Sequence, residues 1–374
     1  MADTIKNTLT DSVPNNNYPK EKASAFEASV TLANTNIEKG NWDVAYSYLK
    51  TAIEINPNYA EGHNHLGVYY TRNKKYTEAI NSFKKALQIN FAFVDAHYNL
   101  ANVYMERKEY AMALSHFKEV VQASPGDYET YYLMGTCCIN DNKEKDAESF
   151  FCESNRLKAD FAPAAINLCK ILIKKQDYAM AKNTLFFLLK KDASLPEVHF
   201  LLGLIYKIQQ KYTKAVHHFR EVVLKEKDNT EAYNLLGECC VEMNMDKQAE
   251  SFFVMALKLD MSYINPFINL GNLYYKQKRY TDAIPYLEEY LKTKEAADSI
   301  NAIWSDTSVK NTEEIVPLYN LLGFCYKLTN NLINARAMWE KSLAVQPHQQ
   351  EIQNELTQLP QPTRIHKKIS LVIE

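Results

Sequence analysis

Residues 66–83 read LGVYYTRNKKYTEAINSF, and variants of this stretch recur every 34 residues along most of the chain. Counted from Gly67 in steps of 34, the residue at each step is small. These eight anchors are Ala33, Gly67, Ala101, Gly135, Cys169, Gly203, Gly237 and Gly271. An alanine stands twelve residues after each anchor, and a leucine or phenylalanine stands sixteen after it. Eight units in register indicate one repeat array rather than two ordinary globular domains.

A ninth unit follows out of register. Gly323, Ala335 and Trp339 restate the pattern, but Gly323 lies 52 residues after Gly271, which is 34 plus an insertion of 18. The chain is therefore predicted to have five parts. They are a polar, disordered segment at 1–22, eight in-register units at 26–297, an insertion at 298–315, a ninth unit at 316–349, and a capping helix with a tail at 350–374.

The spacing inside one unit predicts two short amphipathic helices. Leu66 and Tyr70 lie four residues apart, as do Ala79 and Phe83, and this is the spacing of one helix face. The small anchor and the invariant alanine are expected where two helix backbones approach closely, because a larger side chain would force them apart. Residues that tolerate a left-handed backbone fall between the helices. They are Gly40, Asn142, Asn244 and Asn330.

The order of leucine, glycine, tyrosine, alanine and phenylalanine at these offsets resembles the tetratricopeptide repeat, from about Phe26 to Gln349. The resemblance implies an all-α fold, an α-solenoid whose antiparallel helix pairs stack into a right-handed superhelix. The first helix of each pair would line a concave groove. The resemblance also implies a non-enzymatic scaffold or adaptor that binds a peptide or helical segment of a partner protein. A self-assembling platform, or a subunit of a multiprotein complex, is the alternative.

The composition argues against several other classes of function. With 43 basic and 45 acidic residues, the chain lacks the basic excess with which nucleic-acid-binding proteins neutralise phosphates. No apolar run is long enough to span a membrane, and the N-terminus has no apolar signal core, so a cytoplasmic location is expected. No Gly-rich phosphate loop or catalytic constellation is found. We therefore predict neither an enzyme nor a cofactor.

The cysteines and histidines do not have the spacings of a metal site. The seven cysteines include no C-x-x-C pair, and we expect reduced thiols that are mostly buried. His63, His97 and His199 share one repeat position, four residues before the anchor, where packing or surface roles are expected. His63 and His65 lie two residues apart, so they point in different directions on a helix. No metal site is predicted.

In the resembled family, the residues two before and one after each anchor face the groove. Polar side chains, mostly amides, recur at these positions. They are Asn99, Asn102, Asn167, Lys170, Asn269 and Asn272. Asn99, Asn167 and Asn269 resemble the asparagine ladder with which some members of the family hold a peptide backbone, since an amide both donates and accepts hydrogen bonds. The alternative is that asparagine is only a tolerated polar residue on an exposed helix face.

Apolar residues gather on the same face further along the chain. They are Leu201, Leu204, Ile208 and Leu235. An exposed apolar patch would mark a partner site, but these side chains could instead contact the neighbouring unit. Trp304 in the insertion is a candidate loop contact, because loops often carry function. A passive loop, or a lengthened second helix of the eighth unit, is the other interpretation of the insertion.

Overall fold

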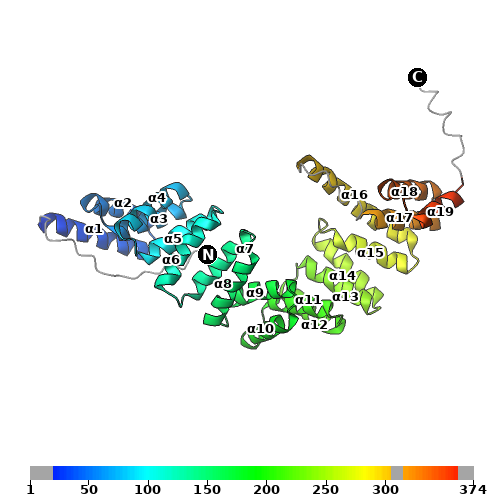
Figure 1. The fold of residues 1–374 in the computed structure, drawn as a ribbon, viewed down its shortest axis with the longest axis horizontal. Coiled ribbons are helices and arrows are strands. Elements are labelled where there is room, and N and C mark those ends of the chain that lie inside the picture. The colour runs from blue at the N-terminus through cyan, green and yellow to red at the C-terminus, as the bar shows by residue number, and fades with distance from the viewer. Residues whose placement is uncertain (1–19, 305–314, 361–374) are drawn as a thin grey trace, which may run out of the picture. The chain divides into compact units, whose positions relative to one another are not determined.

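The computed structural model describes residues 20–304 and 315–360, with the side chains of Lys20 and of 297–304 excepted. Helices are the only regular elements within these ranges (Figure 1). The chain divides into two compact blocks, Met1–Lys191 and Asp192–Glu374, which are named the N-terminal and C-terminal blocks below.

The N-terminal block contains repeats 1 to 5, each a pair of helices. The pairs are α1 (Lys20–Glu38) with α2 (Trp42–Ile55), α3 (Ala60–Arg72) with α4 (Tyr76–Ile89), α5 (Val94–Glu106) with α6 (Tyr110–Ala123), α7 (Tyr128–Asn140) with α8 (Glu144–Leu157), and α9 (Ala162–Lys174) with α10 (Tyr178–Lys191). Each helix packs on the helices before and after it in this block.

The C-terminal block contains repeats 6 to 9 and one further helix. The pairs are α11 (Pro196–Ile208) with α12 (Tyr212–Lys225), α13 (Thr230–Glu242) with α14 (Asp246–Leu259), α15 (Asn265–Lys276) with α16 (Tyr280–Trp304), and α17 (Val316–Leu328) with α18 (Leu332–Val345). The last helix is α19 (Gln350–Gln358). Consecutive helices pack on one another here too, so the predicted all-α solenoid of paired helices is confirmed.

The ends and the insertion are described only in part. Helix α1 begins at Lys20, so nearly all of the predicted disordered segment at 1–22 lies outside the described residues. The insertion predicted at 298–315 begins inside α16, which has 25 residues where the second helices of the other repeats have 14. Residues 305–314, and the tail from residue 361 onward, lie outside the described ranges.

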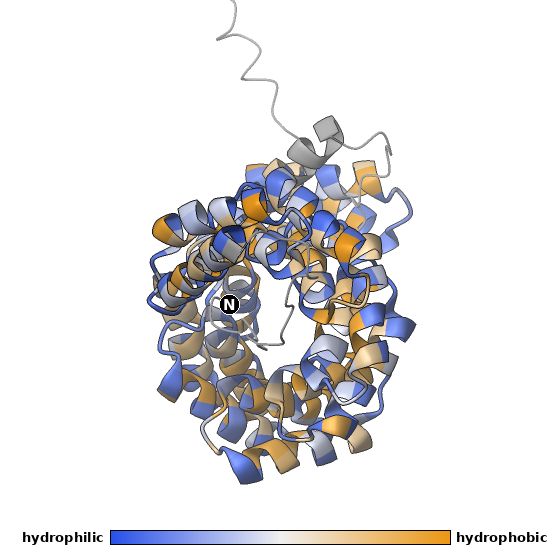
Figure 2. Cartoon of the chain, turned by 90° about the vertical axis from the view of Figure 1, so that its left-hand side faces the viewer, coloured by the Kyte–Doolittle hydropathy of each residue, from blue (hydrophilic) through white to orange (hydrophobic). Residues whose placement is uncertain are grey.

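The helices are amphipathic, and Figure 2 shows hydrophobic and hydrophilic residues side by side along individual helices. The apolar faces bury the invariant alanines and the aromatic residues sixteen after the anchors, such as Ala215 and Phe219. Six of the seven cysteines are buried free thiols, and Cys152 is half-buried. No helix within 20–304 or 315–360 has both the length and the apolar character that crossing a bilayer requires.

The glycine anchors are small because a side chain from the second helix lies directly against them, an aromatic ring in most repeats and Leu287 at Gly271. A Cβ atom added at Gly135 would lie 2.5 Å from the ring of Phe151, and one added at Gly203 would lie 2.6 Å from the ring of Phe219. Carbon atoms in favourable contact are about 3.5–4.0 Å apart, so the ring or the helix would have to move. A larger side chain at these anchors would therefore clash, and the group that it meets is a side chain of the second helix.

Seven residues after each anchor, the turn between the paired helices takes a left-handed conformation. The four residues predicted for such turns do so, with φ between 56° and 75°. Repeats 2, 3, 5, 6 and 8 adopt the same conformation with Lys74, Lys108, Gln176, Gln210 and Lys278. These five turns were missed because lysine and glutamine carry no turn signal of their own.

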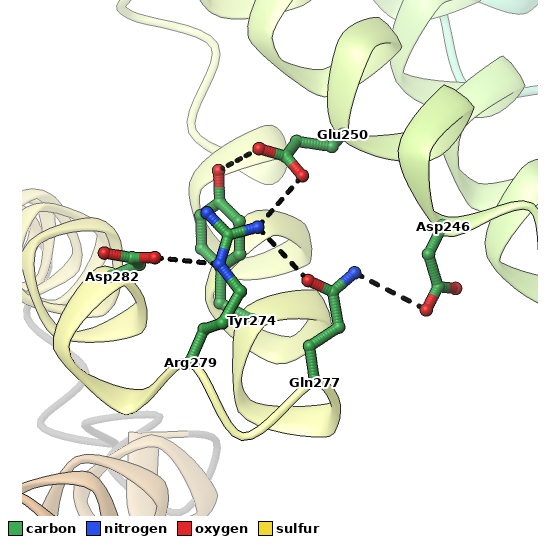
Figure 3. A network of polar contacts seen from close by, with 6 residues as sticks. All are labelled: Asp246, Glu250, Tyr274, Gln277, Arg279 and Asp282. Atoms are coloured by element: carbon green, nitrogen blue, oxygen red, sulfur yellow. Dashed lines mark hydrogen bonds and ion pairs between the residues drawn. The ribbon is translucent and has the colours of Figure 1, made fainter.

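Polar contacts join the second helix of one repeat to the first helix of the next, as Figure 3 shows for repeats 7 and 8. Tyr274 Oη donates to Glu250 Oε1 at 2.9 Å, and Arg279 Nη1 donates to Glu250 Oε2 at 3.2 Å. The guanidinium of Arg279 also lies over the Tyr274 ring, 4.2 Å from its centroid. Tyr319 and Glu295 repeat the tyrosine–glutamate bond at 2.8 Å in the next repeat. These bonds hold successive repeats in register.

Helix α19 packs on α18. Its Ile352 and the following Leu359 are buried, and Glu355 forms an ion pair with Lys327 of α17. Arg336 Nη2 donates to the backbone carbonyls of Leu359 and Pro360, at 3.4 and 3.1 Å. A repeat array needs such a covering element, because its last repeat has no neighbour to bury its apolar face.

Candidate functional site

A cavity of about 540 Å³ lies in the C-terminal block, bordered mainly by the first helices of three successive repeats, α11, α13 and α15, with Tyr212 of α12 and Phe253 of α14. Its apolar lining consists of Leu204, Ile208, Val241, Phe253 and Leu273. Phe253 and Leu273 are buried, whereas Leu204 and Val241 are half-buried and Ile208 is 52% exposed. The cavity therefore has a closed apolar floor and an accessible apolar edge on α11.

Glu238 on α13 is held by three donors. Asn234 Nδ2 donates to Glu238 Oε1 at 2.7 Å, Asn269 Nδ2 donates to the same oxygen at 3.2 Å, and Lys207 forms an ion pair with the carboxylate. Asn269 Nδ2 also donates to Asn234 Oδ1 at 2.9 Å. Both N–H groups of Asn269 are thus engaged, so this amide offers a ligand its carbonyl oxygen. Charge-assisted bonds of this kind fix the side chains before any partner arrives.

The remaining polar lining consists of Tyr212, Glu242, Asn272 and Lys276. Glu242, Asn272 and Lys276 are exposed. Burial and the neighbouring Glu242 carboxylate raise the pKa of Tyr212, so its hydroxyl stays protonated at neutral pH. Lys276 Nζ donates to Asn244 Oδ1 at 3.3 Å. The edge of the cavity therefore presents an amide, a carboxylate and an ammonium group to solvent.

The structure separates the predicted groove residues into two groups. Leu204, Ile208, Asn269 and Asn272 line the cavity, whereas the other amide positions and Lys170 lie in the N-terminal block. There Asn99 Nδ2 donates to the buried Asn64 Oδ1 at 3.1 Å, which repeats the bond between Asn269 and Asn234.

The other polar positions of the N-terminal block differ in exposure. Asn102 is hydrogen-bonded to Tyr98. Asn167 is half-buried and Lys170 is exposed on α9. The binding role of these residues stays a prediction.

Two of the predicted apolar contacts are unsuited to the role assigned to them. Leu201 is 4% exposed and Leu235 is 7% exposed, and Leu235 belongs to the hydrophobic core between repeats 6 and 7. Neither side chain is therefore part of an exposed patch. For Leu235, the packing between repeats 6 and 7 agrees with the alternative that the sequence left open, a contact with the neighbouring unit. Trp304 is the last residue of α16, and its side chain lies outside the described residues.

Sequence reasoning missed Lys207, Val241, Glu242 and Lys276, which lie four or five residues after their anchors. Residues three or four apart share one helix face, so these positions lie one turn beyond the residues at position one after the anchor. That periodicity was the signal that could have identified them.

The buried thiols and His65 do not add a catalytic group to this face. Burial raises the pKa of Cys169 and Cys239 to about 12, so neither thiol is a thiolate nucleophile at neutral pH. Burial lowers the pKa of His65 to about 4, and its Nδ1 atom is buried without a hydrogen-bond partner among the described residues. The two thiols are buried in the core and His65 is half-buried, and the pKa of each group is shifted away from its charged form.

Comparisons with known proteins give the following matches. Residues 2–131 match the model of the tetratricopeptide repeat protein 21 C-terminal ARM domain. Residues 196–224 and 267–297 each match a tetratricopeptide repeat model. No curated protein sequence matches the chain.

Among solved structures, PilF of Pseudomonas aeruginosa is 20% identical, with a TM-score of 0.47 over 54% of this chain and 92% of that chain. A chain of the APC/C hetero-tetramer Cut9–Hcn1 is 17% identical, with a TM-score of 0.48 over 91% of this chain and 64% of that chain. The human IFIT1 dimer with PPP-AAAA is 18% identical, with a TM-score of 0.43 over 87% and 85%.

Proposed function

The chain belongs to the tetratricopeptide repeat family, and on that premise we propose that it is a non-enzymatic scaffold that binds a segment of a partner protein in the cavity between α11, α13 and α15. Proteins built from these repeats as a rule bind other proteins. The observation that carries the proposal is the cavity itself, with an apolar floor and polar groups at its edge.

The size and lining of the cavity suit a few residues of a polypeptide. Its volume of about 540 Å³ falls inside the range of about 300–1,000 Å³ that is usual for ligand sites. Ile208 and Leu204 offer apolar surface that a partner side chain would cover, at about 25 cal/mol for each Å² removed from water. Phe253 and Leu273 close the floor, so a side chain entering the cavity contacts carbon atoms below it as well as beside it.

The polar edge suits the backbone of the same segment. The carbonyl oxygen of Asn269 accepts a backbone N–H, and the exposed amide of Asn272 both donates and accepts. Because Glu238 already has three donors, it is not an additional anchor for a basic side chain. Affinity would therefore come from apolar contact, and orientation from the two asparagines.

The proposal includes neither catalysis nor nucleic-acid binding. The basic and acidic residues of the chain nearly balance, and Lys207 in the cavity is already paired with a carboxylate. The proposal places the scaffold in the cytoplasm, because its seven cysteines are free thiols of the kind that reducing compartments preserve.

The test uses a photo-crosslinking amino acid in place of Asn272, in the full-length chain expressed in its source cells. Mass spectrometry identifies the cross-linked partner segment, and a synthetic peptide of that segment is titrated by fluorescence anisotropy. The double substitution Leu204→Asp and Ile208→Asp should weaken peptide binding at least tenfold, because it places two charges against the apolar contact.

The matched control is Leu224→Asp, since Leu224 is 64% exposed on α12 and does not line the cavity. This substitution should leave peptide affinity unchanged, and circular dichroism confirms that both variants are folded. Equal affinity of the peptide for the wild type and for the folded double variant would remove the cavity from the proposal.

A further inference from the structure

The solvent-facing side of α10 carries apolar side chains that are followed by two lysines. Ala181, Leu185 and Leu188 face the core of the N-terminal block and are buried. On the opposite side of the helix, exposed residues recur at three- and four-residue steps, so they form one continuous face. This face is called the α10 stripe below. Besides Ala179, it consists of Met180, Asn183, Phe186, Phe187, Lys190 and Lys191.

The two phenylalanines of the stripe are unusual for their positions in the repeat. They stand 17 and 18 residues after the anchor Cys169, and they are 44% and 39% exposed. At these two positions, seven of the other eight repeats have at least one charged residue. Repeat 7 has Val254 and Met255 there, and both are half-buried. The repeat fold therefore does not need aromatic side chains at these positions.

The exposure of the phenylalanines belongs to their position in the repeat and not to the boundary between the blocks. Helix α10 is the last helix of the N-terminal block. The first of the two positions is also exposed in repeats whose next repeat belongs to the same block, where the residues are Lys50, Lys84, Lys118 and Arg220. A following repeat does not cover this side of a second helix, so Phe186 and Phe187 are available to a partner.

The C-terminal end of the stripe is positively charged. Lys174 and Lys175 on α9 are paired with glutamates of α8. Lys190 and Lys191 form no such ion pair among residues 20–304 and 315–360. Lys191 Nζ lies over the ring of Phe187, 5.7 Å from its centroid. Ammonium groups and aromatic rings therefore form one surface.

The acidic residues at the two ends of α10 are bonded to the backbone instead of to these lysines. Asp177 Oδ1 accepts from Met180 N at 3.1 Å, and Asp192 Oδ1 accepts from Ser194 N at 2.8 Å. No acidic residue stands on the stripe itself. The stripe therefore complements a surface that is apolar over most of its length and acidic at one end.

We propose that the α10 stripe docks an amphipathic α-helix of a partner protein, which lies antiparallel to α10 and has an acidic first turn. The apolar face of such a helix covers Met180, Phe186 and Phe187. Antiparallel alignment places the first turn of the docked helix beside Lys190 and Lys191. Acidic residues in that turn are also stabilised by the dipole of the docked helix itself.

Two other occupants fit the stripe less well. A second copy packed antiparallel on the same phenylalanines would bring its Lys182 beside Lys191, and like charges that meet in an interface weaken it. A lipid bilayer would meet the exposed Asn183 in the middle of the stripe, where lipid tails offer its amide no hydrogen bond. A partner helix supplies a polar side chain opposite Asn183, because an amide both donates and accepts.

The stripe is independent of the cavity. It lies on a second helix of the N-terminal block, whereas the cavity lies in the C-terminal block, and the two share no residue. The docking of a helix on α10 would therefore give the scaffold a second partner, and it does not depend on what the cavity binds.

Photo-crosslinking identifies the occupant of the stripe. The full-length chain carries p-benzoylphenylalanine in place of Met180 and is expressed in its source cells, because this residue keeps an apolar group on the stripe. Mass spectrometry should identify a partner segment with apolar residues three and four apart and acidic residues in its first turn. A cross-link to lipid, to a second copy or to another segment of the same chain would overturn the proposal, and so would the absence of a cross-link.

Fluorescence anisotropy then measures the affinity of a synthetic peptide of that segment for the full-length chain and its variants. Phe186→Lys with Phe187→Glu installs the residue types that repeat 3 has at these positions, so the variant should stay folded with an unchanged net charge. It should bind the peptide at least about tenfold more weakly, because the apolar contact is lost. Unchanged affinity in the folded variant would contradict the proposal.

Charge reversal tests the acidic end of the docked helix. Lys190→Glu with Lys191→Glu should weaken peptide binding about tenfold, because like charges then meet. The matched control is Lys84→Glu with Lys85→Glu, which changes the net charge equally at exposed positions of α4 and should leave the affinity unchanged. Circular dichroism confirms that the variants are folded. An equal loss of affinity in both charge-reversal variants would rule out Lys190 and Lys191 as the contact.

Discussion

Substitution of the small anchor Gly203 by alanine should destabilise the C-terminal block. The new Cβ would lie 2.6, 2.7 and 2.9 Å from three ring carbons of Phe219. That ring has no exposed surface, so it cannot swing into solvent, and the helices must separate by a few tenths of an ångström to one ångström. Such overpacking costs about 1–3 kcal/mol. Alanine offsets about 1 kcal/mol of this through its higher helix propensity, so the net loss should be about 1 kcal/mol and at most about 2 kcal/mol.

Repeats 1 and 3 show that the array can hold an alanine anchor, and repeat 1 does so with a leucine in place of the phenylalanine. Repeat 1 pairs the alanine anchor Ala33 with Leu49, and repeat 3 accommodates Ala101 beside Phe117, with all four side chains fully buried. Phe219→Leu alone should cost about 1 kcal/mol through the smaller buried side chain. In combination with Gly203→Ala it should cost less than the sum of the two single changes by about 1 kcal/mol, because leucine is the residue that packs on an alanine anchor in repeat 1.

Urea denaturation followed by circular dichroism measures the free energy of unfolding of the wild type, of the two single variants and of the double variant. Hydrogen exchange assigns the change to α11 and α12. The coupling energy is the difference between the effect of the double variant and the sum of the effects of the two single variants. For independent sites it lies within about 0.3–0.5 kcal/mol of zero. That result would refute the reasoning, because it would mean that the ring of Phe219 is not what excludes a side chain at the anchor.

Three further changes follow from particular contacts. Lys108→Gly should raise the free energy of unfolding by up to about 1 kcal/mol in urea denaturation, because Lys108 has a φ of 61° that glycine adopts without strain; a loss of stability would contradict this. Tyr274→Phe should lower the free energy of unfolding by about 1 kcal/mol in the same assay, because it removes the 2.9 Å hydrogen bond to Glu250. Tyr275→Phe is the control, because the Tyr275 hydroxyl is not part of that bond. His65→Gln should flatten the dependence of stability on pH between 7 and 5. The pKa of His65 is about 4 in the folded chain and 6.5 in the unfolded chain, so only the unfolded chain takes up a proton between pH 7 and pH 5. The free energy of unfolding of the wild type therefore falls by about 2 kcal/mol over this range. An unchanged slope in the variant would contradict the assignment.

The repeat architecture could be predicted from the sequence because its determinants are small, invariant and evenly spaced. An anchor such as Gly203 and the ring of Phe219 are related by a fixed offset of sixteen residues, and that offset is visible without coordinates. The left-handed turns could be predicted only where glycine or asparagine occupies them. At Lys108 and Gln210 the conformation is imposed by the helices on either side, so the residue type gives no sign of it.

The candidate site was harder to predict because facing the groove and being accessible are different properties. Leu201 and Leu204 both lie on α11, yet Leu201 is buried, whereas Leu204 is only half-buried. The role of an amide likewise depends on its neighbours. Asn269 has both its N–H groups bound to Asn234 and Glu238, and a single position in a repeat pattern does not reveal those partners.

Repeats 3 and 6 have the same residues where their two helices meet but different residues at their groove positions. His97 is paired with His116 in repeat 3, and His199 with His218 in repeat 6, each through ring nitrogens 3.0 Å apart where the two helices of the repeat meet. The segments at 116–121 (HFKEVV) and 218–223 (HFREVV) recur with the same spacing of 102 residues. At the groove positions the same repeats differ, with Asn99 and Asn102 in one and Leu201 and Leu204 in the other. Because packing within a repeat does not involve the open side of its first helix, that side can change while the fold is retained. The open side in repeats 6 to 8 is where the cavity lies, and this independence from packing is a physical reason to look for partner binding there.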